Sequence, residues 1–367
     1  MCSSAYHLAS LSFYRESVEA ALERDVADTP AADFAFVDIH VASSCLQKAL
    51  RRGELGFAHS AARLLLRDDP ERLWRRLCVC AFEDFGLGDL SVTARVVAVA
   101  GNRGFRLVQG EERVLGHLIQ LLCSIPKDRR LDDLYGLGAT VLADSGRLKL
   151  IEGASPDLAP LVHQASRLIA SCERPVPRRS FRAVSSEASV RALARMAADG
   201  LVDAGLFELC AKGVRLSRCL LPLLAPPAIA ATEAMGGLGP AIQVPLPAVP
   251  LIGGVPAYAL DGFTRVGRTV LARLFVQEQR LQDLLADVPA TKRLDVLHHL
   301  LFVAEGSLCS PLISDGLSDA LKSEAMACAG GLTREAVMAG VALIGQLSPA
   351  LHRLRERIIS RQEEDLS

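Results

Sequence analysis

The chain has 367 residues, of which half are hydrophobic and 23% are charged, and its formal net charge is −1. This hydrophobic content excludes an intrinsically disordered chain, and the balanced charge excludes a surface that is basic throughout and coats nucleic acid. The length indicates about two domains. Leucine and alanine dominate, whereas aromatic residues make up only 5%, so the composition favours an all-α fold.

Residues 1–35 are expected to form a short helical arm and a loop. Their first apolar stretch is interrupted by Arg15 and Glu16, so the sequence shows no secretory signal. Ten cysteines are scattered along the chain, several of them in apolar runs such as Leu77–Ala81, and no pair has Cys-x-x-Cys spacing. These features predict reduced, buried thiols in a cytoplasmic protein.

Glycine and aspartate delimit the first predicted helices. A helix over 36–52 is expected to end at Gly53, because glycine adopts the backbone conformation that closes a helix. A second helix covers 55–66. The third, over 70–84, begins with Asp69 and Pro70, since aspartate accepts hydrogen bonds from free N–H groups and proline suits the first helical position.

The predicted helix over 70–84 carries apolar residues at the spacing of one buried face. Gly86 and Gly88 follow it, and Asp89 is expected to cap a helix over 90–100. Further helices are expected at 111–125, 130–145, 157–172, 187–199, 202–212, 262–287, 291–305, 311–329 and 333–359.

A polar, proline-bearing stretch at 176–186 predicts a linker or crossover between a domain at 36–175 and a second helical domain at 187–367. Within the second domain, residues 219–260 are apolar, and Glu233 is their one charged residue. Eight prolines interrupt this segment, so no run reaches the ~20 apolar residues that a membrane-spanning helix needs. The segment is expected to be irregular and packed against helices, or to form an interaction surface, and no membrane partner is expected.

Four short stretches share their order and spacing with one known family: Lys48–Gly53, Asp69–Pro70, Trp74–Leu77 and Phe82–Leu90. Over 44–90 the chain resembles the C-terminal domain of bacterial replication-associated recombination protein A, whose eukaryotic relative is the Werner-helicase-interacting protein. In that family these stretches read Lys-Ser-Ile-Arg-Gly, Asp-Pro, Ala-Arg-Arg-Leu and Ser-Glu-Asp-Ile-Gly-Leu-Ala-Asp-Pro. The chain departs from the pattern at Phe82, Gly88 and Leu90, and the resemblance fades after about residue 125.

The resemblance implies an all-α module that builds an oligomer and is related to the collar of clamp loaders. We therefore expect an all-α, two-lobed helical bundle whose N-terminal lobe resembles that collar. The resemblance also implies work at stalled replication forks beside single-strand-binding protein, as a homo-oligomer. The chain has no Gly-x-x-x-x-Gly-Lys-Ser/Thr phosphate loop, so we expect no ATP hydrolysis and no nucleotide cofactor. A separate AAA+ ATPase is the partner that would supply that activity.

Six basic residues form two clusters on the resembling helices. They are candidates for contact with DNA phosphates or with a partner protein: Lys48, Arg51, Arg52, Arg72, Arg75 and Arg76. The second three recur at i, i+3 and i+4, so they share a helix face. The competing interpretation is structural, because arginines at these positions can pair with the nearby acidic residues inside the module.

The acidic signature consists of Glu83, Asp84 and Asp89, with Gly86 at the turn. Adjacent carboxylates point in different directions on a helix, so Glu83 and Asp84 do not form a convergent catalytic pair. We expect them to cap or tether the turn.

His298 and His299 are adjacent, whereas metal ligands on one helix prefer i, i+4 spacing. Asp295 and His299 have that spacing but lack a third ligand nearby. An ordinary hydrogen bond is therefore favoured, and no metal is expected.

In the stretch 253–268, a loop rich in glycine and proline enters the predicted helix over 262–287. Its polar residues are candidates for a ligand or phosphate site: Tyr258, Asp261, Thr264, Arg265 and Arg268. Asp261 and Arg265 are expected to pair at i, i+4, and Gly267 to admit another backbone. A plain docking loop is the competing interpretation.

The sequence therefore predicts a non-catalytic accessory or scaffold protein in DNA replication, recombination or repair. Two alternatives stay open. One is a regulatory subunit of a separate AAA+ ATPase, and the other is an enzyme or ligand-binding protein with a pocket near 253–268.

Overall fold

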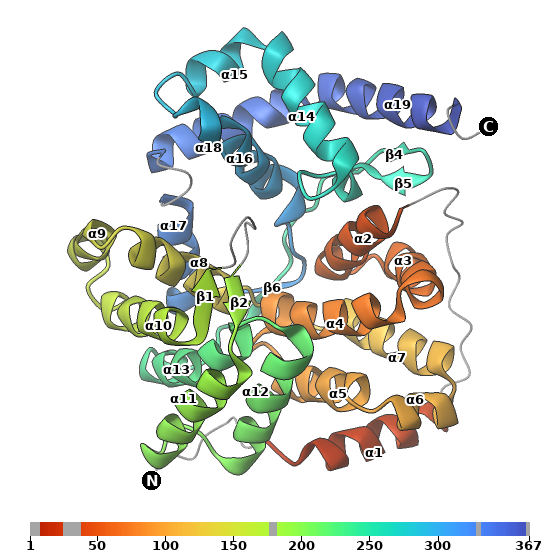
Figure 1. Cartoon of the computed structure of the whole chain (residues 1–367), viewed down its shortest axis with the longest axis vertical. Helices are drawn as coiled ribbons and strands as arrows, with labels where there is room; N and C mark the ends of the chain where they lie inside the picture. The colour runs from red at the N-terminus through yellow and green to blue at the C-terminus, as the bar shows by residue number, and fades with distance from the viewer. Residues whose placement is uncertain (1–7, 25–37, 176–181, 328–331, 365–367) are drawn as a thin grey trace. The chain divides into compact units, whose positions relative to one another are not determined.

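The fold is all-α, as the composition predicts. The computed structural model describes residues 8–24, 38–175, 182–327 and 332–364. Helices dominate these residues, and the strands in them are two or three residues long and occur in antiparallel pairs (Figure 1). Among the described residues, no helix combines the length and the apolarity needed to cross a membrane.

The described residues fall into two compact units, each assembled from separate stretches of the chain. Unit 1 takes in 8–24, 71–175, 182–243 and 311–325, and unit 2 takes in 38–70, 244–310, 326–327 and 332–364. The predicted ranges 36–175 and 187–367 divide the chain differently, since each unit contains residues from both of them. Part of the predicted linker, 176–181, lies outside the described residues, as do 1–7 and 25–35 of the predicted arm.

Unit 1 contains most of the helices. They are α1 (Leu11–Leu22), α4 (Pro70–Cys80), α5 (Leu90–Ala100), α6 (Arg103–Gln109), α7 (Glu111–Ser124), α8 (Arg130–Ala143), α9 (Gly146–Ala154), α10 (Ala159–Cys172), α11 (Ser186–Ala198), α12 (Ala204–Ser217), α13 (Leu221–Ala234) and α17 (Gly316–Ala327).

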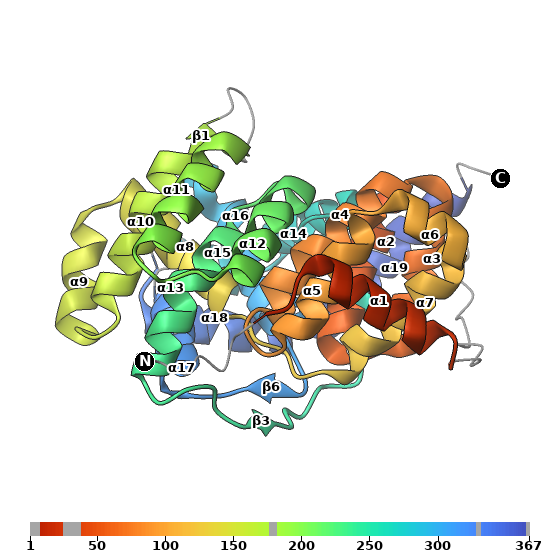
Figure 2. The same ribbon diagram turned by 90° about the horizontal axis from the view of Figure 1, so that it is seen from below.

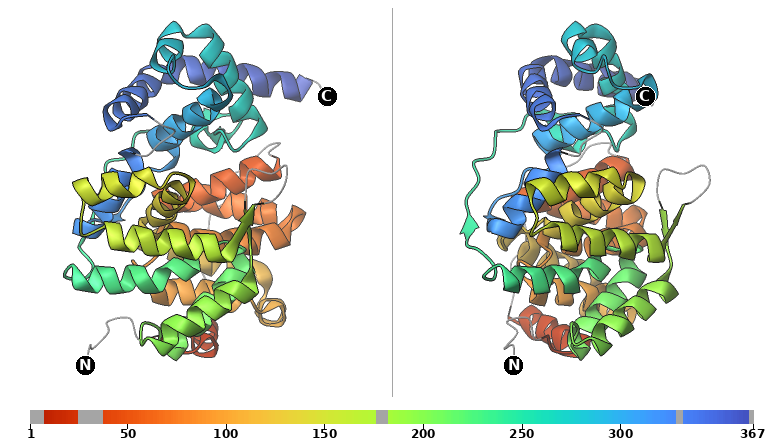
Figure 3. Two further views of the ribbon diagram at one scale, coloured as in Figure 1. Left: turned by 60° about the vertical axis from the view of Figure 1, so that its left-hand side comes forward. Right: turned by 90° about the vertical axis from the view of Figure 1, so that its left-hand side faces the viewer.

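The packing of unit 1 centres on α8, α10 and α13, which lie side by side in Figure 3. Gly138 of α8 permits this close approach, because a Cβ there would lie 3.0 Å from the side chains of Ala165 and Ile169 of α10. Two short strand pairs accompany the helices. β1 (Glu173–Pro175) pairs with β2 (Arg182–Val184), and β3 (Ala241–Ile242) pairs with β6 (Leu312–Ile313), as Figure 2 shows for the second pair.

Unit 2 is built on α2 (Ile39–Arg52), which packs against α3 (Leu55–Asp68). Its other elements are β4 (Leu251–Ile252), β5 (Val255–Pro256), α14 (Arg265–Gln277), α15 (Gln279–Leu284), α16 (Ala290–Leu301), α18 (Arg334–Gln346) and α19 (Ser348–Glu364). α14 packs against both α16 and α19. Gly53 ends α2 with a φ of +70°, as its position in the sequence predicts.

The structure corrects the prediction for 219–260. Residues 221–234 form α13, with Pro226 and Pro227 inside the helix. The first eight residues of α13 are all buried, and this apolar packing offsets the backbone hydrogen bonds that the two prolines cannot donate.

Two long predicted helices are each divided. The predicted helix over 262–287 breaks at Glu278, whose backbone is extended, into α14 and α15. The one over 333–359 breaks at Leu347, just before Ser348 and Pro349 start α19. Proline lacks the N–H that a continuous helix would need, and it therefore sits in the first turn of the new helix.

Candidate functional site

The family-like signature of unit 1 forms a tight junction at the end of α4. The helix widens there into a π turn, Ala81–Phe85, which ends at Gly86 with a φ of +42°. A Cβ on Gly86 would lie 2.9 Å from the backbone oxygen of Asp128, whose own N–H donates to the Asp84 carbonyl at 2.8 Å. Only glycine fits this position without strain. It adopts a positive φ without steric cost, and it has no Cβ to clash with the Asp128 carbonyl.

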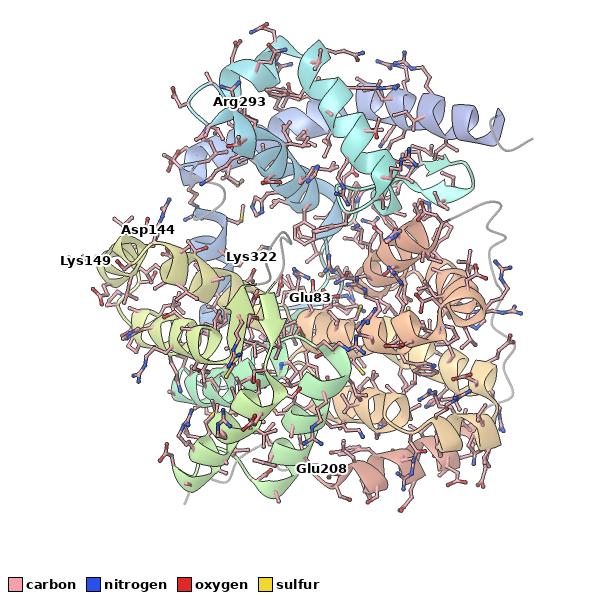
Figure 4. The ribbon with its side chains drawn as sticks, in the orientation of Figure 1. Glu83, Asp144, Lys149, Glu208, Arg293 and Lys322 are labelled. Carbon is pink, nitrogen blue, oxygen red and sulfur yellow. The ribbon has the colours of Figure 1, made fainter. Side chains whose placement is uncertain are left out.

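The acidic residues of this junction hold structure together. The Asp84 side chain is fully buried and pairs with Arg129, which also pairs with Asp132. Arg129 also approaches Glu83, the residue labelled in Figure 4, to 3.7 Å. Asp89 caps α5, since its Oδ1 accepts hydrogen bonds from the N–H groups of Ser91 and Val92, each at 3.0 Å. Asp84 and Glu83 thus lie against Arg129, and Asp89 caps a helix.

The three arginines of α4 lie at the surface of unit 1. Arg72, Arg75 and Arg76 are half-exposed, while Leu73 and Trp74 of the same helix are buried. Glu71 lies 4.0 Å from Arg75 and accepts a hydrogen bond of 3.0 Å from Arg218 at the end of α12. Glu71 thus lies between Arg75 and Arg218 on this face.

The candidate contact residues of α2, Lys48, Arg51 and Arg52, are buried inside unit 2. Lys48 Nζ pairs with Asp261 and donates to Ser44 Oγ at 2.6 Å. Arg51 Nη1 donates to the Gly306 carbonyl at 2.6 Å. The face of α2 that carries these residues packs inside the unit, so their charged groups bind partners within unit 2.

Arg52 contacts three different groups. Its Nε donates to Glu54 at 2.7 Å, its Nη2 donates to the Pro247 carbonyl at 2.8 Å, and its guanidinium lies 5.3 Å from the centre of the Tyr258 ring. Tyr258 in turn donates its hydroxyl proton to Glu54 at 2.5 Å. Arg52 and Tyr258 thus form one buried, hydrogen-bonded group.

Burial lowers the pKa of the Lys48 ammonium, and Asp261 opposes that shift because the two groups attract. The Asp261 carboxylate also accepts the N–H of Phe263 at 3.0 Å, and its carbonyl accepts from Thr264. This pair therefore fixes the end of the 253–264 loop.

The expected pair of Asp261 with Arg265 does not form. Thr264 caps α14, its Oγ1 accepting from the N–H of Gly267 at 3.0 Å, so Asp261 precedes the helix and turns to Lys48 instead. A Cβ on Gly267 would lie 1.8 Å from the Asp261 carbonyl oxygen. This glycine therefore allows a close backbone approach, and the segment that approaches is the loop just before the helix. The five candidate ligand residues are therefore divided between a buried network and an exposed helix face.

The outer face of α14 is basic. Arg265, Arg268 and Arg273 are exposed, and none forms an ion pair with any residue that the structure describes. A shallow hollow of about 550 Å³ runs along this face beside Arg268, Arg273 and Val276. Phe263, at the start of the helix, is 71% exposed.

A second cavity, of about 220 Å³, lies within unit 2 beside Tyr258. Its polar lining consists of Arg52, Tyr258, Glu305, Ser348 and His352. The last three were missed by sequence reasoning, since they come from a π turn, Phe302–Gly306, and from α19. The i, i+4 spacing of Ser348 and His352 was the available signal.

The polar groups of this cavity are linked to one another. Arg355, fully buried, donates to both oxygens of Glu305, at 2.8 and 3.3 Å. His352 Nε2 lies 3.3 Å from Ser348 Oγ and 3.9 Å from Glu305 Oε1. Burial and the charge of Arg355 lower the pKa of His352, while Glu305 opposes them, so the imidazole is neutral at pH 7.

The described residues hold no group of three His, Cys, Asp or Glu side chains that could bind a metal. The Nε2 atoms of His298 and His299 are buried and have no hydrogen-bond partner in the described part of the chain. Burial lowers the pKa of both imidazoles. His298 packs against Gly262, where a Cβ would lie 2.6 Å from the ring.

No family model, curated protein or solved structure matches this chain.

Gly86→Ala should lower the free energy of unfolding by more than the ~1–2 kcal/mol that a left-handed alanine costs, since its Cβ also meets the Asp128 carbonyl. Gly153→Ala is the matched control, because nothing lies within 4 Å of its Cβ position in α9. Urea unfolding followed by circular dichroism measures both. Equal stability of the two variants would contradict the tight junction.

Lys48→Met should destabilise unit 2 by about 3–5 kcal/mol, because it leaves the Asp261 carboxylate buried without its cation. Adding Asp261→Asn should recover much of that loss, since the amide oxygen can still accept from the Phe263 N–H. The measurement is chemical unfolding of the two single variants and the double variant. Additive losses would argue against a coupled pair.

Stability should fall as the pH drops below ~6.5, the ordinary pKa of histidine. The folded-state pKa values of His298 and His299 are lowered, so below this pH the unfolded chain binds more protons than the folded chain. This proton binding stabilises the unfolded chain relative to the folded one. His299→Phe removes one of these groups and should make unfolding less dependent on pH between 7 and 5. An unchanged dependence would show that His299 is not buried in its neutral form.

Proposed function

We propose that this chain is a non-catalytic accessory or scaffold protein in DNA replication, recombination or repair. Two features support the proposal. The first is the resemblance of 44–90 to the collar-like domain of the replication-associated recombination protein A family. The second is the rigid junction at Gly86, which is built from the residues that carry this resemblance.

The observation that carries the DNA-binding part is the arginine surface. Arg72, Arg75 and Arg76 share a partly exposed face of α4, the helix that bears the Trp-Arg-Arg-Leu signature. Arginines on a surface neutralise phosphates, which gives affinity without sequence specificity. Lys48, Arg51 and Arg52 are left out of this surface because their charged groups are buried.

The outer face of α14 supplies a second set of cations in unit 2. Its three arginines are exposed, and so is Phe263 just before the helix. This combination suits single strands, whose phosphates meet cations while bases stack on aromatic rings. We therefore favour single-stranded or forked DNA over an intact duplex.

In this proposal the chain forms a two-lobed, collar-like homo-oligomer and leaves ATP hydrolysis to a separate AAA+ ATPase. The sequence contains no phosphate loop, which supports the assignment of ATP hydrolysis to a separate protein. Single-strand-binding protein is the partner that the family resemblance suggests at a replication fork.

The test is binding of the purified chain to single-stranded, gapped and forked DNA over a salt series, with the oligomeric mass measured in parallel. Arg72→Ala/Arg75→Ala/Arg76→Ala and Arg265→Ala/Arg268→Ala/Arg273→Ala should each weaken binding. Each variant should also reduce the slope of log affinity against log salt, by up to ~2 if all three arginines contact phosphates.

Arginine-to-lysine changes at the same positions are the matched controls, because they keep the charge and should retain most of the binding. Circular dichroism and urea unfolding confirm that each variant is folded. If folded forms of both alanine variants bind DNA with unchanged affinity and salt slope, DNA contact through these faces is wrong.

A further inference from the structure

The cavity beside Tyr258 has the size and the wall of a site for a small organic molecule. All of its lining residues belong to unit 2. Its volume of about 220 Å³ equals that of ~7 water molecules in the liquid. The wall is largely apolar, through Pro247, Val249, Pro250, Leu308 and Ile344, and the exposed residue Gly345 lies at its edge.

One guanidinium N–H group of Arg52 is available to a ligand. The side chain is only 4% exposed, and its Nε and Nη2 atoms already donate to Glu54 and to the Pro247 carbonyl. Its Nη1 has no hydrogen bond to the described part of the chain. A guanidinium N–H that has no partner in the described part of the chain can donate to an acceptor placed in the cavity, and a carboxylate suits a guanidinium best.

The second polar part of the cavity offers hydrogen-bond acceptors. Arg355 donates twice to the Glu305 carboxylate, which has about four acceptor positions in all. The hydroxyl of Ser348 and the neutral imidazole of His352 lie beside it. An ammonium group, with its three donors, would find acceptors here.

The charges of the lining already balance, since Arg52 is paired with Glu54 and Glu305 with Arg355. A ligand with a net charge would leave that charge buried and uncompensated, whereas a zwitterion adds none. The apolar wall requires an apolar body between the two charged groups and the protein.

From these contacts we infer that the cavity binds a free α-amino acid with an apolar side chain. Its carboxylate meets Arg52 Nη1, its ammonium group meets Glu305 and Ser348, and its side chain packs on Pro247, Val249 and Ile344. The inference stands apart from the proposed DNA binding, because none of the arginines on α4 or α14 contributes to it.

Isothermal titration calorimetry and thermal unfolding with L-leucine and L-valine test the inference on the full chain. Saturable binding with a rise in melting temperature is expected. Leucinamide, which lacks the carboxylate, and N-acetylleucine, which lacks the ammonium group, should each bind at least about tenfold more weakly. L-Lysine should bind more weakly too, because its side-chain charge would be buried.

Gly345→Leu is the decisive variant. Gly345 lines the cavity, and nothing lies within 4 Å of its Cβ position, so a leucine side chain there meets no clash and removes no polar contact. It should abolish leucine binding and leave DNA binding unchanged, and Gly153→Leu, at an open position of unit 1, should change neither.

Arg52→Lys keeps the charge but loses the free N–H of the fork, and it should remove the preference for leucine over leucinamide. The inference is overturned if neither amino acid binds the native chain, or if Gly345→Leu binds leucine as tightly as the native chain does. Equal binding of leucine and N-acetylleucine would overturn the role of Glu305.

Discussion

A lysine ammonium group buried at the end of α2 must find a negative partner inside unit 2, and Asp261 provides it. Removing both charges from water costs several kcal/mol per ion, so the pair persists only when its geometry is good and its remaining hydrogen bonds are made. The Phe263 N–H and Ser44 Oγ make those bonds. Because Asp261 is held in place, Thr264 can cap α14, and the start of α14 then determines which arginines point outward. The basic face of this helix thus depends on a contact that lies beneath it.

The same end of α2 shapes the cavity. Arg52 holds the Pro247 carbonyl on one side and lies over the Tyr258 ring on the other, so one side chain positions two parts of the wall. Opposite them, the carboxylate of Glu305 is fixed by Arg355. Unit 1 contains a similar ion pair, because Arg129 fixes Asp84 in its π turn. In each unit a widened helical turn carries a carboxylate that pairs with an arginine, and π turns are frequent at functional positions.

Local chemistry made much of the fold predictable. Gly53, Asp69, Pro70 and Asp89 mark helix ends in the sequence, and the helices begin or end beside them because capping depends on neighbours a few residues apart. The burial of Lys48 was not predictable, since its partner is 213 residues away. The same holds for the cavity, where Arg52, Glu305 and His352 meet only after folding. Pro226 and Pro227 misled the prediction of α13, because proline disfavours a helix locally while burial of the surrounding apolar residues favours it.

The π turns also make the segments that follow them sensitive to chain length. A π turn holds one residue more than the α-helical turn that it replaces, and each residue of an α-helix turns the following side chains by about 100°. Deleting one residue within Phe302–Gly306 would therefore restore an ordinary helix and rotate everything beyond it out of phase with α16. Substitutions in this turn change one side chain at a time, whereas a change of length alters the direction of the whole following segment. Sequences that descend from a common ancestor with this chain should for that reason vary more freely in composition than in length at this turn.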